Sequence, residues 1–260
     1  MNYRASLEEQ DRARWKLSLE SFLKNPEEPV LITALRRALN SSSRPVFARG
    51  IDKCEYIVKG RQAGRQIIND QVVARLGLAM GAPVGKPQIV EISPELLELD
   101  PAFSFLIPGK AHGTHFIPDC FDDRDASKYK DHSGNRERFA LLSVLFGWVH
   151  SRDEQFIYQT IHPNLVYSVD HGRFFPGGYA WTAESLQNAS EAEVDRKLIL
   201  SCSLTNHEIK QALSALEAVK EETIIQAVAS PPDEWEITID ERIVMVEYLI
   251  KRQRFLLKSL

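Results

Sequence analysis

The spacing of hydrophobic side chains divides the chain into a mixed first half and a mainly helical second half. From residue 6 to about residue 39, apolar residues such as Trp15, Leu19 and Phe22 recur at mixed helical spacing. Ser6 and Glu9 have the spacing of a capping box, which predicts that a helix begins there. The polar run at residues 40–45 ends this pattern.

After this break the period changes to that of strands. The sequence predicts strands at residues 45–49, 54–59 and 84–92, and one helix at residues 65–80. In that helix Ile68, Val72, Leu76 and Met80 recur every four residues and form one apolar stripe. This part of the chain is therefore expected to fold as a small sheet with one inserted helix.

From about residue 108 the chain is polar and glycine-containing, and we expect a loop that connects two lobes. Residues 138–150 are apolar on nearly all sides, which indicates a buried helix, and residues 165–169 form a short strand. Further capping boxes are predicted at Ser190 with Glu193, Thr205 with Glu208, and Thr238 with Glu241.

These elements predict an α+β, two-lobed fold. Residues 1–44 form an N-terminal helical extension, residues 45–110 a small β-rich lobe with one helix, and residues 111–260 a larger, mainly helical lobe.

Composition narrows the classes of partner. Lys and Arg number 32 and Asp and Glu 36, which gives a net charge of −4 and argues against a nucleic-acid partner. No apolar run approaches the ~20 residues that span a bilayer, so no membrane association is expected. Three scattered cysteines fit neither a disulfide framework nor a paired metal clip. We therefore expect a cytoplasmic protein.

Four charged residues suggest phosphoryl transfer because of the order in which they follow one another along the chain. Lys59 ends a predicted strand, and Asp70 lies in the first turns of the next helix, where it can pair with the lysine. Asp153 follows the buried helix in a polar loop suited to a general base. Asp170 follows a short strand, where a carboxylate is well placed to hold Mg²⁺. Kinases use such groups to position nucleotide phosphates.

The sequence resembles the HipA-like kinases, a branch of the protein-kinase-like fold that is more distantly related to phosphoinositide kinases. The similarity covers roughly residues 45–185. The matching stretches are Tyr56-Ile57-Val58-Lys59, residues 68–77, Gly81-Ala82-Pro83-Val84-Gly85-Lys86-Pro87, Asp153, residues 167–172 and Phe174-Phe175-Pro176-Gly177-Gly178.

The resemblance implies transfer of the γ-phosphoryl group of ATP–Mg²⁺ to a hydroxyl, of a protein serine or threonine. It implies that Lys59 contacts the ATP phosphates, Asp70 holds Lys59, Asp153 is the catalytic base and Asp170 binds Mg²⁺. A protein substrate or partner protein is then expected besides ATP.

Three positions depart from the kinase pattern. The helix acid is Asp70, where kinases usually have glutamate. The metal-binding asparagine expected about five residues after the base is replaced by Tyr158, and Gln155 or Glu154 is a candidate substitute. In place of a glycine-rich phosphate loop, Gly50 stands alone between two predicted strands as a nucleotide-binding candidate.

Two other functions remain open at this stage. One is a pseudokinase that binds a nucleotide or a partner protein without phosphotransfer, which the replacement of the asparagine motivates. The other is a metal-dependent hydrolase that uses His112 and His115, whose H-x-x-H spacing lies in a predicted loop beside the cleft.

Overall fold

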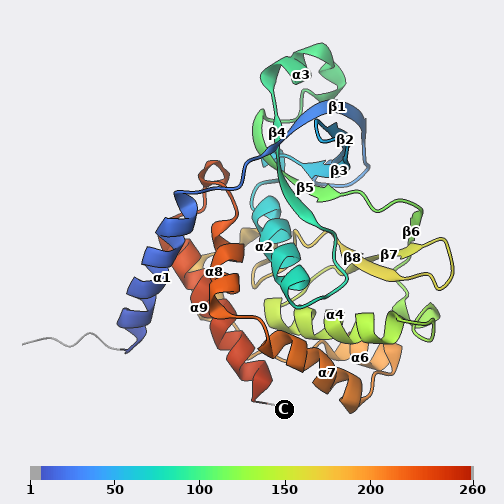
Figure 1. The fold of residues 1–260 in the computed structure, drawn as a ribbon, viewed down its shortest axis with the longest axis vertical. Helices are drawn as coiled ribbons and strands as arrows, with labels where there is room; N and C mark the ends of the chain where they lie inside the picture. Colours follow the sequence, from blue (N-terminus) through green and yellow to red (C-terminus); the bar gives the residue numbers. More distant parts are fainter. Residues whose placement is uncertain (1–6, 259–260) are drawn as a thin grey trace, which may run out of the picture.

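The computed structural model describes residues 7–258, which form a small β-barrel above a larger body made mostly of helices (Figure 1). The strands are β1 Val30–Ala38, β2 Val46–Gly50, β3 Glu55–Lys59, β4 Pro87–Ile92, β5 Gly109–His115, β6 Cys120–Asp122, β7 Gln155–Gln159 and β8 Val166–Val169. The helices are α1 Leu7–Leu23, α2 Gln66–Ala79, α3 Pro94–Leu99, α4 Asn135–Val149, α5 Ala183–Gln187, α6 Arg196–Cys202, α7 Asn206–Glu217, α8 Glu221–Ala229 and α9 Ile239–Leu257. Helices and sheets are thus mixed along the chain, as the sequence predicts.

The barrel has the strand order β1-β2-β3-β5-β4 and closes where β1 pairs in parallel with β4. Alternate side chains point inward, because successive residues of a strand face opposite sides. Ala48 and Tyr56 are direct cross-strand partners and both are buried. The barrel therefore has a hydrophobic core of its own, which includes Ile32, Val46, Val58 and Val90.

The second sheet, β6-β7-β8, belongs to the larger core together with the long helices. Helix α2 also packs there, against α4 and α8, and most of its residues are buried. The chain after α2 joins the two sheets, because the Ser168 backbone N–H donates to the carbonyl of Pro83 at 2.8 Å. A segment that leads back to the barrel thus also holds β8.

The predicted N-terminal helix is shorter than expected. Helix α1 ends at Leu23 and packs against α8 and α9, and residues 30–38 form strand β1 instead of helix. Pro26 and Pro29 explain the difference, because proline lacks a backbone donor and ends helices, and the β-branched residues that follow favour a strand. The Ser6 part of the predicted capping box lies outside the described residues.

The prediction of a loop from about residue 108 is wrong for the first part of that segment, because residues 109–115 form strand β5 between β3 and β4. Gly113 permits this close packing, because a Cβ there would lie 2.7 Å from Val90. The barrel therefore runs from β1 to β5 and crosses the predicted boundaries at residues 45 and 110.

The capping boxes at Thr205 and Thr238 are confirmed at the starts of α7 and α9. The one predicted at Ser190 is wrong, because the next helix, α6, begins later, with Asp195 as its N-cap residue. Over residues 7–258, no helix is both long enough and apolar enough to cross a membrane.

Candidate active site

Lys59 meets two carboxylates that come from distant parts of the sequence. Its Nζ lies 2.8 Å from Oδ2 of Asp70 on α2 and 2.5 Å from Oδ1 of Asp170, directly after β8. The Lys59 side chain is 6% exposed and that of Asp70 is 5% exposed, whereas that of Asp170 is 28% exposed. The structure therefore brings together three of the predicted site residues, and Asp70 reaches Lys59 despite its short side chain.

The charges of this cluster stabilise one another. Burial acts to lower the pKa of Lys59, but Asp70 and Asp170 outweigh it and raise that pKa above its ordinary value. Burial acts to raise the pKa of Asp70, and the nearby Lys59 ammonium outweighs it, so that pKa is lowered. Lys59 is thus a cation and Asp70 an anion at neutral pH.

A cavity of about 450 Å³ opens beside Lys59, between the barrel and the sheet β6-β7-β8. This volume falls within the roughly 300–1,000 Å³ of ordinary ligand pockets. Its upper wall includes residues of β3 and β5, and its lower wall includes residues of β6 and β7 together with the end of β8. Its lining includes Arg37, Leu39, Ser41, Ile57, Lys59, Asp70, His112, Thr114, Phe116, Asp122, Gln155, Val169 and Asp170.

Gln155, and not Tyr158, is placed beside Asp170. Gln155 is the first residue of β7, and its side-chain nitrogen lies 3.4 Å from Oδ2 of Asp170. Tyr158 is fully buried, and its ring centroid lies 4.2 Å from that of Tyr129. Strand β7 begins directly after Glu154. The residue five positions after Asp153, Tyr158, therefore lies within the strand and in the hydrophobic core, not at the site.

Gln155 and Asp170 fit a magnesium ion that is bound together with phosphate. Both offer hard oxygen donors at the cavity wall, and Mg²⁺ usually takes one or two protein carboxylates plus phosphate oxygens and water. Within residues 7–258, no group of three or more His, Cys, Asp or Glu side chains could hold a metal ion by itself. Two protein ligands would leave the remaining coordination positions of such an ion to phosphate oxygens and water.

Asp153 lies in the turn between α4 and β7, at the edge of this site. Its backbone is left-handed, with φ of 54°, and its carboxylate pairs with Arg124 at 3.3 Å and with Arg173 at 3.8 Å. Arg173 follows Asp170 by three residues, and Gln155 follows Asp153 by two. The two loops that carry Asp153 and Asp170 therefore lie side by side, although Asp153 does not line the cavity.

Gly50 is not brought to the site. It ends β2 at the far side of the barrel, since Val46 pairs with Val58, next to Lys59, and Arg49 pairs with Glu55. The loop at residues 39–45, which joins β1 to β2, lies at the cavity instead and lines it with Leu39, Ser41 and Pro45.

Sequence reasoning missed the role of this loop because it assigned β1 to a helix. The signal that could have found it is the β-branched run after Pro29. The loop is rich in serine, so it presents hydroxyl groups where a glycine-rich loop would present backbone N–H groups.

His112 and His115 do not converge on a metal. They lie three residues apart on β5, so their side chains face opposite sides of the strand. The His112 ring is buried, with Nδ1 2.8 Å from the Gln71 amide and Nε2 3.0 Å from the Thr114 hydroxyl, and burial lowers its pKa to about 4. The His115 ring packs on the Tyr56 ring, with 4.7 Å between the two ring centroids. The geometry gives the hydrolase hypothesis no support.

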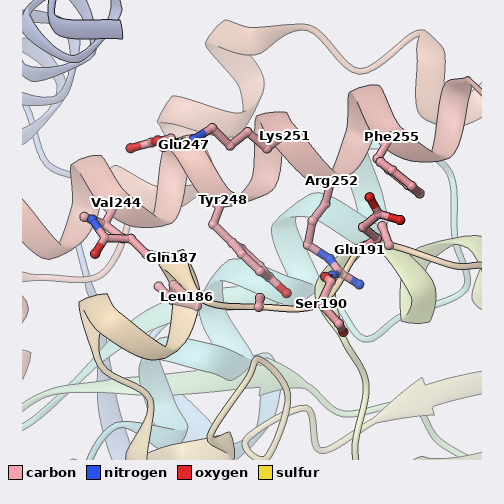
Figure 2. A pocket seen from close by; sticks show the side chains of 12 residues that line it. Leu186, Gln187, Ser190, Glu191, Val244, Glu247, Tyr248, Lys251, Arg252 and Phe255 are labelled. Carbon is pink, nitrogen blue, oxygen red and sulfur yellow. Dashed lines mark hydrogen bonds and ion pairs between the residues drawn. The ribbon is translucent and has the colours of Figure 1, made fainter.

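A second pocket lies between α9 and the segment that follows α5, and it contains none of the candidate residues (Figure 2). Arg252 extends from α9 beside Ser190 there and donates to the Ser190 carbonyl at 2.7 Å. It also donates to the carbonyls of Gly147 at 2.5 Å and Trp148 at 2.7 Å, at the C-terminal end of α4. These contacts hold the helix end from which the Asp153 loop emerges.

Comparison with known proteins points to kinases. A family model described as HipA-like kinase matches residues 31–260, and no curated protein matches the chain. The crystal structure of the Helicobacter pylori proinflammatory kinase CtkA is similar, with a TM-score of 0.60 and 9% identity over 88% of this chain and 94% of that chain.

The Golgi casein kinase matches with a TM-score of 0.49 and 12% identity over 96% of this chain and 76% of that chain. HipA from Shewanella oneidensis MR-1, solved with HipB and operator DNA, matches with a TM-score of 0.46 and 11% identity, over 100% of this chain and 74% of that chain. At such low identity, the likeness to CtkA shows a shared fold and nothing more specific.

Proposed function

Because the chain belongs to the HipA-like kinase family, and family and fold together support a kinase-type phosphotransferase, we propose that it transfers the γ-phosphoryl group of ATP–Mg²⁺ to a hydroxyl group of a protein serine or threonine. The observation that carries the proposal is the position of Lys59. Its Nζ lies between Asp70 and Asp170 at the wall of a cavity of about 450 Å³.

Each residue then has a distinct role in binding. Asp70 holds the Lys59 side chain, whose ammonium group lies within reach of phosphate oxygens in the cavity. The Asp170 carboxylate and the Gln155 amide would hold the metal ion, which would supply positive charge to the phosphates. Ser41, on the loop between β1 and β2, lines the same cavity, and its hydroxyl is a further donor for phosphate oxygens.

Asp153 acts on the acceptor. As the acceptor oxygen forms a bond with the γ-phosphorus, Asp153 takes the hydroxyl proton. The bond between the γ-phosphorus and the oxygen that bridges it to the β-phosphorus breaks, and ADP leaves. Arg124 and Arg173 lie on either side of the Asp153 carboxylate and hold it in the turn. Most of the catalytic effect comes from positioning and charge neutralisation.

Transfer of label from [γ-³²P]ATP, to the protein itself or to an added protein, tests this function. Asp153→Asn keeps the size of the side chain but removes the base, and we expect at least a hundredfold loss of transfer, within the range of about 10²–10⁴ for acid–base catalysis. Asp131→Asn is the matched control, because Asp131 is exposed and, among residues 7–258, its one ion pair is with Arg136 at 3.6 Å.

Equal transfer by wild type and Asp153→Asn would remove Asp153 from the mechanism. Binding of ATP without transfer by the wild type would instead favour the nucleotide-binding pseudokinase, which is motivated by the presence of Tyr158 where kinases have the metal-binding asparagine.

A further inference from the structure

Asn69 connects helix α2 to the segment that follows Asp170. Its side-chain nitrogen donates to the carbonyls of Gly172 at 2.9 Å, Phe174 at 2.9 Å and Gly178 at 3.2 Å. Asn69 is completely buried. One amide thus reaches three points of a segment more than 100 residues later in the chain.

The oxygen of the same amide is also bonded. It accepts from the indole Nε1 of Trp181 at 2.7 Å, and Trp181 is itself buried. The Arg65 guanidinium lies 4.4 Å from the Trp181 ring centroid and pairs with Glu241 at the start of α9 at 2.5 Å. The segment is therefore held from α2 and, through Arg65, from α9.

Gly172 allows the segment to lie directly on α2. A Cβ at this position would lie 2.9 Å from the Cβ of Gln66 and 3.3 Å from Oδ2 of Asp70. Any larger residue would push the backbone away from α2. The close approach occurs two residues after Asp170 and beside the carboxylate that holds Lys59.

We infer that Asn69 is a positioning residue, which fixes the metal-binding Asp170 relative to the Lys59–Asp70 pair. This inference rests on the proposed function. Asn69 neighbours Asp70 in sequence, and its contacts begin two residues after Asp170. One buried amide therefore fixes the positions of both carboxylates relative to each other.

Asn135 provides a matched control for the loss of a buried amide. It is also fully buried, and its nitrogen donates to the carbonyls of Tyr129 and Asn164 at 3.0 Å, while its oxygen accepts from the Val166 N–H at 2.9 Å. These contacts lie at the start of α4 and at the start of β8, which is the end of that strand opposite to Asp170. Loss of either amide removes several hydrogen bonds made by a fully buried side chain, so both variants should lower the melting temperature.

The experiment compares Asn69→Ala with Asn135→Ala in the full chain. Binding of a fluorescent ATP analogue is titrated with Mg²⁺, and kcat and KM are measured with [γ-³²P]ATP. We expect Asn69→Ala to raise the half-saturating Mg²⁺ concentration and to lower kcat, each by about tenfold, as for partners that orient metal ligands. We expect Asn135→Ala to change neither value. Trp181→Phe, which removes only one donor, should shift the Mg²⁺ requirement in the same direction by less.

The outcomes separate the two proposals. If the wild type binds and uses ATP but Asn69→Ala and Trp181→Phe keep wild-type Mg²⁺ dependence and kcat, the positioning role is wrong while the proposed function stands. The role is equally wrong if Asn135→Ala shifts both values as far as Asn69→Ala does. If the wild type itself shows no Mg²⁺-dependent nucleotide binding, the proposed function fails, and the inference fails with it.

Discussion

Lys59 is a buried cation with two carboxylate partners, and only one of them is buried as deeply as the lysine. Its pairing with Asp70 could be predicted from the sequence, because Asp70 lies in the first turns of the next helix along the chain and the same pair occurs in the kinases that the sequence resembles. The contact with Asp170 depends on the path of more than 100 intervening residues. The sequence therefore shows that Asp170 follows Lys59 and Asp70 along the chain, but it does not predict that Asp170 contacts Lys59.

Removal of the lysine charge should destabilise the fold. Lys59→Met leaves the Asp70 carboxylate buried beside an apolar side chain, and we expect the free energy of unfolding to fall by about 3–5 kcal/mol. Lys59→Met combined with Asp70→Leu should recover a large part of this loss, because the only carboxylate of the cluster that then lacks its lysine partner is Asp170, which is 28% exposed. Urea unfolding measures both variants, and strictly additive losses in the double variant would contradict the pairing.

His112 should make the stability depend on pH. Burial lowers its folded-state pKa to about 4, from 6.5, so between these values the unfolded chain binds a proton that the folded chain does not. The free energy of unfolding should therefore decrease as the pH falls through this window, by up to about 3 kcal/mol. Asp70 is held below its own ordinary value of 3.8 and adds its loss only at lower pH.

His112→Gln removes this titration while it keeps polar side-chain atoms near Gln71 and Thr114. Urea unfolding between pH 7 and pH 4.5 should show a shallower slope for His112→Gln than for the wild type. Parallel slopes would show that His112 does not contribute to the pH dependence.

The elements around the site were predictable where local pattern and tertiary structure agree. Helices α2 and α4 and strands β3 and β8 match their predicted ranges closely, since their apolar residues are buried as the pattern requires. Strand β1 was missed because its hydrophobic spacing, read together with that of α1, resembles a long helix. Strand β5 was missed because Gly109 and Gly113 look like loop residues until β3 and β4 pair with them.

The start of β7 decides which side chain meets Asp170. We expect Gln155→Leu to raise the Mg²⁺ concentration needed for half-maximal transfer by about tenfold or more, because it removes the amide that we propose as a metal ligand. Tyr158→Phe should leave activity and stability close to wild type, since no described residue forms a hydrogen bond with the buried Tyr158 hydroxyl. A loss of Mg²⁺ affinity in Tyr158→Phe but not in Gln155→Leu would reverse this assignment.

At the scale of the whole molecule, the site is divided between the two hydrophobic cores. Lys59 belongs to the barrel, whereas Asp70, Gln155 and Asp170 are carried by elements of the larger core. The sequence predicted a β-rich part and a helical part but assigned α2 to the former. Hydrophobic periodicity identifies a buried face and does not identify the core against which it packs. A ligand that bridges Lys59 and Asp170 would therefore contact elements that belong to both cores.

Thermal unfolding with ATP, in the presence and absence of Mg²⁺, tests the central claim most directly. If the cavity beside Lys59 is the ATP–Mg²⁺ site, ligand at 100 times its Kd should add about 2.7 kcal/mol to the free energy of unfolding. Asp170→Ala should abolish the Mg²⁺-dependent part of this gain. An absence of any shift at millimolar ATP with Mg²⁺ would contradict the account, for a kinase and for a nucleotide-binding pseudokinase alike.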